Sequence, residues 1–199
     1  RIGRVDPIGA RVVDADGLVV APGFIDLHTH YDAQLHFEPS ASPSSWHGVT
    51  TVVVGNCGFS LAPSRPDDVA WVAKMLSRVE GMSEDALLAG VTYRGGSMAE
   101  FLANLDGRVG VNVAAYAGHC AIRRWVMGEA ASERAATPDE IADMVALLEV
   151  QLDDGAIGFS SSQLQIHVDH EGRPVPSNLA TYDELVALAS VLATRSAQK

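Results

Sequence analysis

Short apolar runs alternate with longer amphipathic segments along most of this sequence. The apolar runs lie near Phe24–His28, Thr51–Val54, Val109–Tyr116 and Ala156–Ser160, and each is predicted to be a β-strand. Strands that alternate with amphipathic helices indicate an α/β fold built on a parallel sheet. Four such units make half of a (β/α)8 barrel of the TIM type. We therefore expect residues 23–199 to be the first four βα units of an incomplete barrel.

Helix starts are predicted from three capping boxes, in which a Ser or Thr caps the helix and a Glu three residues later reaches back. The caps are Ser97, Thr137 and Thr181, and the corresponding glutamates are Glu100, Glu140 and Glu184. A further helix is expected over Asp67–Val79, because Pro66 suits a first helical position and apolar residues follow at helical spacing.

Residues 1–22 show a different pattern from the rest of the chain. Two short β-like runs, Arg11–Val13 and Leu18–Val20, flank the turn signal Asp14–Gly17. This arrangement predicts a hairpin. We expect residues 1–22 to be the end of a small β-domain that precedes the barrel.

The charge balance narrows the possible partners. The chain has 199 residues and a formal net charge of -11. An acidic protein is a poor partner for nucleic acid, because phosphate contacts require an excess of Lys and Arg.

No apolar run approaches the roughly 18 residues that cross a bilayer. We expect a cytoplasmic protein without membrane contact, in which Cys57 and Cys120 are free thiols.

The strongest chemical signal is the His-x-His pair at the end of the first predicted strand. Residues two apart on a strand project to the same side, so His28 and His30 can bind one metal ion. The alternative is a pair of ordinary surface or core histidines. In barrels the active site lies at the carboxyl ends of the strands. Asp26 shares that face and either orients a ligating imidazole or holds the start of the strand.

The second predicted strand leads to Cys57, which lies in the sequence Gly55-Asn56-Cys57-Gly58. A thiolate is a good zinc ligand, and neighbouring glycines allow the backbone to bend closely around an ion. Taken alone, a buried inert cysteine is the commoner interpretation. Together with the His pair on the preceding strand, metal ligation becomes the favoured one.

Two long stretches, Ala21–Gln34 and Trp46–Pro63, resemble the N-acyl-D-amino-acid deacylases, or D-aminoacylases, of the amidohydrolase superfamily. Shorter similarities follow at Gly118–Arg124, Gly158–Ser160 and Gly172–Ser177, so the resemblance spans nearly the whole chain. It implies a zinc-dependent hydrolase that cleaves the linear amide bond of N-acyl-D-amino acids.

The resemblance also implies roles for individual residues. His28, His30 and Cys57 correspond to zinc ligands, and the cysteine takes the place of a carboxylated lysine found on the fourth strand of many other amidohydrolases. The fourth predicted strand here contains no lysine. Members of this family are longer, so the general base and further ligands are expected beyond Lys199. We accordingly expect the chain alone to be inactive.

Other polar residues are weaker candidates. His119 and Arg123 lie near the end of the third strand and are candidates for substrate binding, Arg123 through a bidentate pair with a carboxylate. A histidine satisfied within the core and an arginine solvated at the surface are the alternatives. His167 and His170 lie in a polar loop after the fourth strand. Such loops often cover barrel sites, but simple solvation is the favoured interpretation.

Two alternative functions stay open. One is an amidohydrolase for cyclic amides, similar to a hydantoinase or dihydroorotase, which the absence of a fourth-strand lysine disfavours. The other is a non-catalytic fragment that mainly associates with other chains. A half barrel exposes two sheet edges, which predicts self-association.

Overall fold

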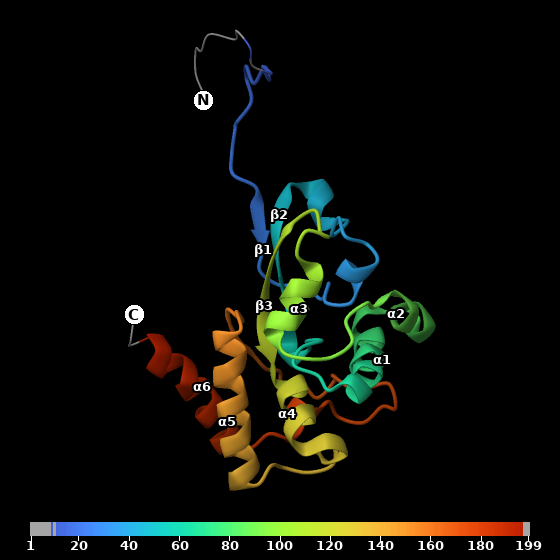
Figure 1. Ribbon diagram of the computed structural model, residues 1–199, viewed down its shortest axis with the longest axis vertical. Coiled ribbons are helices and arrows are strands. Elements are labelled where there is room, and N and C mark those ends of the chain that lie inside the picture. Colours follow the sequence, from blue (N-terminus) through green and yellow to red (C-terminus); the bar gives the residue numbers. More distant parts are fainter. Residues whose placement is uncertain (1–8, 10, 197–199) are drawn as a thin grey trace.

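The protein is an α/β structure built on one parallel sheet. The computed structural model describes residue 9 and residues 11–196. The sheet has the order β1-β2-β3-β4, and its strands are β1 (Phe24–Asp26), β2 (Val49–Val54), β3 (Asn112–Gly118) and β4 (Gly158–Ser160). Neighbours in the sequence are thus neighbours in the sheet, which curls as half of a barrel (Figure 1). The predicted α/β class with four parallel strands is confirmed.

Helices follow the strands in the sequence. They are α1 (Val69–Glu80), α2 (Glu84–Gly90), α3 (Met98–Leu105), α4 (His119–Met127), α5 (Pro138–Asp153) and α6 (Tyr182–Ser196). In Figure 1 α4, α5 and α6 lie in the lower half of the folded body, and α1 and α2 lie to the right of β3. Within the described ranges, none of the helices combines the length and apolarity needed to cross a bilayer.

The capping boxes behave differently from one another. Glu140 in α5 accepts a hydrogen bond from the backbone N–H of Thr137 at 2.8 Å, as the capping box predicts. Glu100 in α3 does the same for Ser97 at 2.8 Å. In α6 Thr181 still caps the N–H of Glu184 at 3.2 Å, but the Glu184 carboxylate turns into the protein interior. The prediction of a complete third capping box is therefore wrong.

A hydrophobic core lies between the sheet and the helices in the described part of the chain. Fully buried side chains include Val52 and Val54 from β2, Leu76 from α1 and Phe101 from α3. Burial of each such side chain contributes about 1.5–3 kcal/mol relative to exposure. The same core continues through Leu148 of α5, so it holds β2, which leads to the candidate site, in a fixed position.

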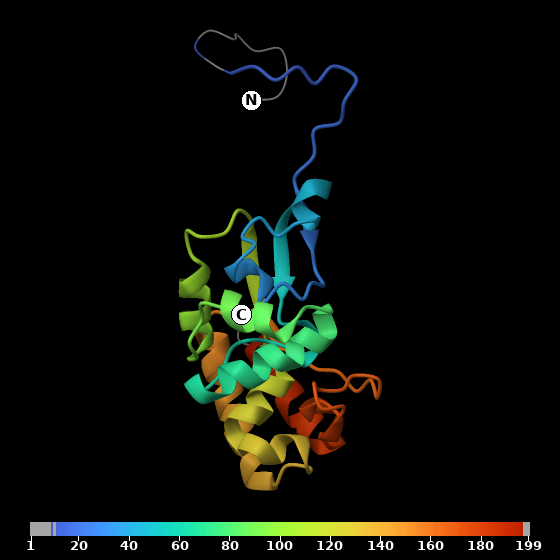
Figure 2. The ribbon, with the colours of Figure 1, turned by 90° about the vertical axis from the view of Figure 1, so that its right-hand side faces the viewer.

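The predicted hairpin near the start of the chain is not formed. The described residues 11–22 contain the turn, in which the N–H of Leu18 donates to the carbonyl of Ala15 at 3.0 Å, but no strand. Val13 and Val19 are 76% and 92% exposed, and the segment extends away from the folded body (Figure 2). Two short strands without a packing partner are marginal in water. Residues 1–8 and 10 lie outside the described residues, and the small β-domain stays a prediction.

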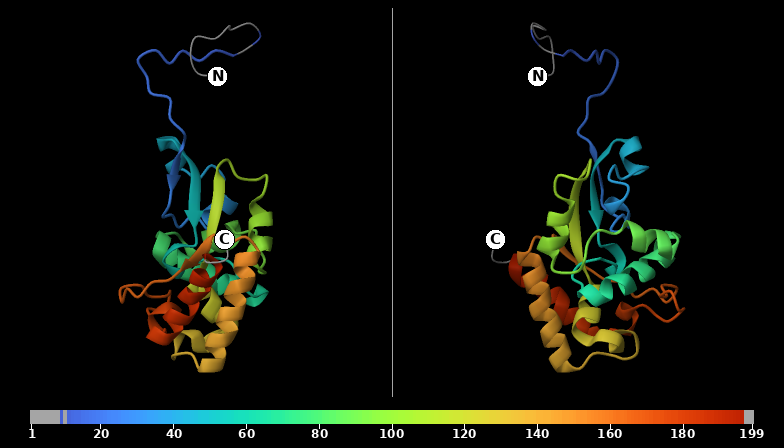
Figure 3. Two further views of the ribbon diagram at one scale, coloured as in Figure 1. Left: turned by 90° about the vertical axis from the view of Figure 1, so that its left-hand side faces the viewer. Right: turned by 45° about the vertical axis from the view of Figure 1, so that its right-hand side comes forward.

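Both edges of the sheet carry exposed apolar side chains. Phe24 and Ile25 of β1 are 64% and 60% exposed, and Ile157 beside β4 is 55% exposed. Figure 3 shows β1 and β4 at opposite margins of the sheet. These are the edges from which self-association was predicted, and that association stays a prediction.

Candidate metal centre

Three potential metal ligands meet where β1 and β2 end. The ligand atoms of His28, His30 and Cys57 all lie within 4.8 Å of one another. The Cys57 Sγ lies 3.3 Å from Nε2 of His28, and the two imidazole rings are 5.4 Å apart in a T-shaped arrangement. In the part of the chain that the structure describes, no other group of three His, Cys, Asp or Glu side chains converges in this way. The structure thus brings together the three residues chosen from the sequence.

The pairing of β1 with β2 sets the direction of the two histidines. Asp26 pairs with Val52 in parallel register, and the chain beyond β1 stays attached to β2 through Thr29. The backbone N–H and the hydroxyl of Thr29 both donate to the carbonyl of Val53, at 3.1 and 2.7 Å. Because Thr29 is anchored and points inward, its neighbours His28 and His30 project from the other side of the chain.

A tight loop at the end of β2 presents the cysteine. Cys57 has a φ of 55°, in the left-handed region, and Gly55 and Gly58 have φ values of 78° and 80°. A Cβ on Gly55 would lie only 2.4 Å from the carbonyl oxygen of Tyr116, so only glycine fits there. A left-handed conformation is costly for a residue with a side chain. The loop therefore needs contacts with the surrounding structure to hold Cys57 in this conformation.

Three polar side chains supply those contacts. The Asn56 amide donates to the carbonyls of Thr29 and Val53 at 3.2 and 2.9 Å. Asp32 accepts the N–H of Gly55 at 3.1 Å. Ser160, at the end of β4, accepts the N–H of Gly58 at 2.9 Å and donates to the carbonyl of Gly55. Sequence reasoning did not single out these three residues.

Asp32 is a buried carboxyl group beside the loop. It is 1% exposed, and burial raises its pKa to about 7, although the N–H of Gly55 works in the opposite direction. Its Oδ1 atom has no hydrogen-bond partner among the described residues. Asp32 lies two residues after His30 in the sequence, so its position in the motif was the available signal.

Among the described residues, Asp26 makes no hydrogen bond to an imidazole ring. Its carboxylate accepts the backbone N–H of His28 at 3.3 Å and the hydroxyl of Ser44 at 3.0 Å. Ser44 is also within 2.9 Å of the Tyr31 hydroxyl. Of the two roles considered for Asp26, these contacts match the structural one, because the carboxylate fixes the backbone at His28 rather than its ring.

The electrostatic environment suits metal binding. Burial, with the proximity of His28 and His167, lowers the pKa of His30 to about 4, so its ring is neutral at pH 7, as a metal ligand must be. The Nδ1 atom of His30 is buried and has no partner among the described residues. Burial raises the pKa of the Cys57 thiol, and a bound cation would reverse that effect. Two imidazoles and one thiol are a donor set that fits zinc.

His167 lies closer to this centre than its loop position indicated. Its ring is 5.3 Å from Phe59, which in turn is 6.0 Å from His30. Nδ1 of His167 is hydrogen-bonded to Ser162 at 2.9 Å. The loop after β4 therefore folds back toward the strand ends, and the His167 side chain is half-buried, which agrees better with a loop that covers the site than with a fully solvated one.

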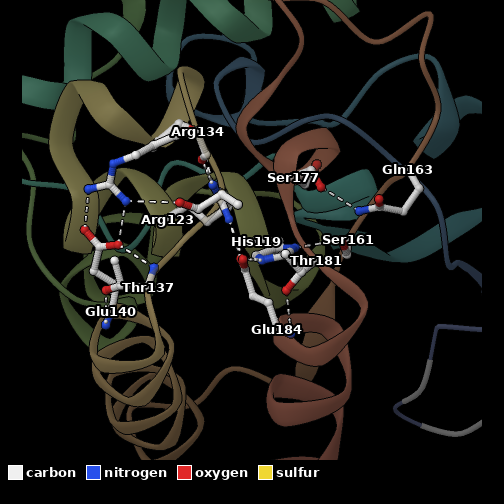
Figure 4. Close-up of polar contacts among 12 residues, drawn as sticks. His119, Arg123, Arg134, Thr137, Glu140, Ser161, Gln163, Ser177, Thr181 and Glu184 are labelled. Carbon is white, nitrogen blue, oxygen red and sulfur yellow. Dashed lines mark hydrogen bonds and ion pairs between the residues drawn. The ribbon is translucent and has the colours of Figure 1, made fainter.

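His119 and Arg123 belong to a separate, buried cluster (Figure 4). Nε2 of His119 lies 2.8 Å from Glu184, and its Nδ1 lies 2.8 Å from the Ser161 hydroxyl. Arg123 donates from Nη1 to both carboxylate oxygens of Glu184, at 2.6 and 2.5 Å, and from Nη2 to the carbonyl of Arg134 at 2.8 Å. The side chains of His119, Arg123 and Glu184 are all 0% exposed.

These contacts correct the expectation that His119 and Arg123 bind substrate. Burial lowers the pKa of His119, so the ring is neutral and donates from Nε2 to Glu184. Burial alone would raise the pKa of Glu184, but hydrogen bonds from His119 and Arg123 hold it below its usual value. The carboxylate that Arg123 binds is internal, so the pair joins α4 to α6 instead of facing a ligand.

Comparison with known proteins agrees with this architecture. The sequence profile of the Amidohydrolase family matches residues 11–196. An uncharacterized protein of Mycobacterium tuberculosis (strain ATCC 25618 / H37Rv) is 36% identical over 97% of this chain and 33% of its own length. D-aminoacylase of Alcaligenes xylosoxydans xylosoxydans is 42% identical over 75% of this chain and 28% of the enzyme.

A solved structure of a deacylase is also similar to this chain. The crystal structure of N-acyl-D-glutamate deacylase from Bordetella bronchiseptica, in complex with zinc and a phosphonate inhibitor, has a TM-score of 0.67 at 33% identity. The match covers 87% of this chain and 32% of that one. The chain belongs to the amidohydrolase family, and it spans about a third of the length of the relatives that it matches.

Proposed function

We propose that this chain is part of a zinc-dependent hydrolase that cleaves the amide bond of N-acyl-D-amino acids. The observation that carries the proposal is the convergence of His28, His30 and Cys57 at the carboxyl ends of two neighbouring parallel strands. Sequence similarity to a D-aminoacylase and structural similarity to an N-acyl-D-glutamate deacylase support the choice of substrate class.

The three side chains would hold the metal ion. His28 and His30 would bind as neutral imidazoles and Cys57 as a thiolate, after loss of its proton. When bound, zinc supplies a Lewis acid that polarises an amide carbonyl and lowers the pKa of a coordinated water. Asp26 and Thr29 fix the backbone on either side of His28, so that the ring is aimed before any ligand arrives.

In this proposal the general base and the remaining ligands belong to the part of the enzyme that this chain does not cover, since the chain spans about a third of the length of the relatives that it matches. The described residues at this centre have other roles, because Asp26 and Asp32 both accept backbone N–H groups. In this proposal the chain contributes metal binding and one wall of the site, and proton transfer belongs to the rest of the enzyme.

The test is hydrolysis by the full-length protein. We expect zinc-dependent turnover of N-acetyl-D-amino acids, loss of activity with a chelator, recovery with Zn²⁺, and little turnover of the L-enantiomers. Cys57→Ala is expected to lower activity at least about 100-fold, because removal of a direct ligand costs more than removal of an outer-shell partner. Cys120→Ala removes the other thiol, which donates to the Ser177 hydroxyl and is not one of the three proposed ligands, and it is expected to lower activity far less than Cys57→Ala does.

Three results would contradict the proposal. One is turnover that persists without metal, and another is equal rates with both enantiomers. The third is activity confined to a cyclic amide such as dihydroorotate, which would instead support the alternative amidohydrolase function.

A further inference from the structure

We propose that Ser160 is a positioning residue that holds the Cys57 thiol in place for metal binding, an inference that rests on the proposed metal centre. Its hydroxyl accepts the N–H of Gly58 at 2.9 Å and donates to the carbonyl of Gly55. These two groups flank Cys57 on either side in the sequence. One atom from β4 therefore closes a loop that belongs to β2.

The loop is a single short 3-10 turn over Asn56–Gly58. The N–H of Phe59 donates to the carbonyl of Asn56 at 2.8 Å. Gly55, Cys57 and Gly58 all have positive φ values. For Cys57 this conformation is unfavourable in isolation. External contacts must therefore select it.

The other contacts on this loop restrain less of it than Ser160 does. Asn56 reaches back to Thr29 and Val53, and Asp32 takes only the N–H of Gly55. Both restrain the segment before Cys57. Among the described side chains, Ser160 bonds to both ends of the Gly55–Gly58 segment. Ser160 is thus the side chain that fixes the orientation of Cys57, which lies between these two glycines.

The position of Ser160 is itself well determined. It ends β4, where it pairs in register with Gly118 of β3. The loop also rests on this strand end, because the site of a Cβ on Gly58 would lie 3.4 Å from the Cα of Ser161 and 3.6 Å from the Cβ of His119. The serine hydroxyl is therefore presented to the loop from a rigid element.

The chemistry requires a group that donates and accepts at the same time. A hydroxyl can do both, whereas an ammonium group can only donate. Ser160→Ala would leave the Gly58 N–H and the Gly55 carbonyl without this partner, while all three proposed metal ligands remain. Ser160→Thr keeps the hydroxyl on a residue type that suits a strand. The two variants thus separate the loss of the hydroxyl from the effect of substitution itself.

The experiment uses Co²⁺ as the probe in the full-length protein, with the thiolate-to-cobalt absorption band as the readout. The part of the band that Cys57→Ala abolishes reports coordination by Cys57. We expect Ser160→Ala to weaken Co²⁺ binding by about 10–100-fold, the usual cost of losing an outer-shell partner, and to diminish that band. Ser160→Thr should restore both. Ser77→Ala, which removes an equally half-buried hydroxyl from α1, should change neither.

A second readout needs no metal. In the metal-free protein we expect Cys57 to react faster with iodoacetamide in Ser160→Ala than in the unmodified protein, because the loop is released.

An unchanged cobalt band and affinity in Ser160→Ala would overturn the positioning role while leaving the metal centre intact. Absence of a Cys57-dependent band in the unmodified protein would instead refute the proposed metal centre. The iodoacetamide rate would then decide whether Ser160 holds Cys57.

Discussion

Two histidine clusters lie near the carboxyl ends of the same sheet, and they differ in what surrounds the rings. In the first, His28 is exposed, His30 is half-buried, and Nδ1 of His30 has no partner within the described structure. In the second, both nitrogens of His119 are hydrogen-bonded and its side chain is 0% exposed. A histidine is available for chemistry only when its neighbours leave a ring nitrogen free. The first cluster can accept a ligand and the second stabilises the fold.

The largest expected difference between the clusters is in stability. Glu184→Gln removes the charge that Arg123 needs, and the guanidinium then stays buried without a counter-ion. Breaking a buried ion pair in this way typically costs about 3–5 kcal/mol. Urea denaturation of the full-length protein measures the change in the free energy of unfolding.

Glu140→Gln is the matched control for that measurement. Glu140 occupies the same position in the capping-box sequence of α5, but it pairs with Arg134 nearer the surface. We expect a change of no more than about 1 kcal/mol, because exposed ion pairs contribute little and glutamine can still cap. Equal effects of the two substitutions would show that the buried cluster is not a stabilising one.

The pH dependence of stability provides a second distinction. Burial lowers the pKa of His119, so the unfolded chain binds that proton more readily than the folded protein does. The stabilisation is therefore complete above about pH 6.5 and decreases as the pH falls toward the folded pKa. His119→Gln should flatten the dependence of unfolding free energy on pH below about pH 6.5, by up to about 1.4 kcal/mol per pH unit.

Some slope should remain in that variant. His30 and His36 both have a pKa lowered to about 4, mainly by burial, and they act in the same direction. Urea titrations at several pH values give the slope. If the slope of His119→Gln equals that of the unmodified protein, His119 is not neutral in the folded state.

The smallest expected effect concerns backbone strain at Cys57. In the presence of a chelator, Cys57→Gly should be more stable than Cys57→Ala by about 0.5 kcal/mol. Glycine relieves the left-handed conformation, and this gain exceeds its entropic cost in the unfolded chain. At Cys120, which lies in α4, the order should reverse by about 1 kcal/mol, since alanine favours a helix. Thermal unfolding of the four variants tests both signs, and the same order at the two positions would argue against strain at Cys57.

The sequence predicts much of the sheet and the three potential ligands. Each of the four strands was expected close to where it occurs, because short apolar runs between amphipathic segments are a strong signal of a parallel sheet. His28 and His30 could be placed together because strand geometry fixes the direction of residues two apart. Cys57 could be added because it follows the next strand in the sequence.

The contacts that support these residues could not be predicted. Glu184 has the spacing of a capping residue, and its inward turn depends on the charge of Arg123, 61 positions away. Ser160 is one of many serines, and its partners lie 102 and 105 positions earlier. α2 was missed because it is short and Ser83 caps it without a glutamate three residues later. Local patterns determine elements, whereas long-range polar contacts depend on how the elements pack.

The separation between Ser160 and the loop that it closes has a consequence for how the protein is made. At synthesis rates of about 5–20 residues per second, the roughly 100 residues from Cys57 to Ser160 take on the order of 5–20 s to appear. Throughout that interval the loop lacks its contact with β4, and nothing from that strand selects the left-handed conformation of Cys57. On the ribosome, His28, His30 and Cys57 are therefore present well before they are held in the arrangement of the folded protein.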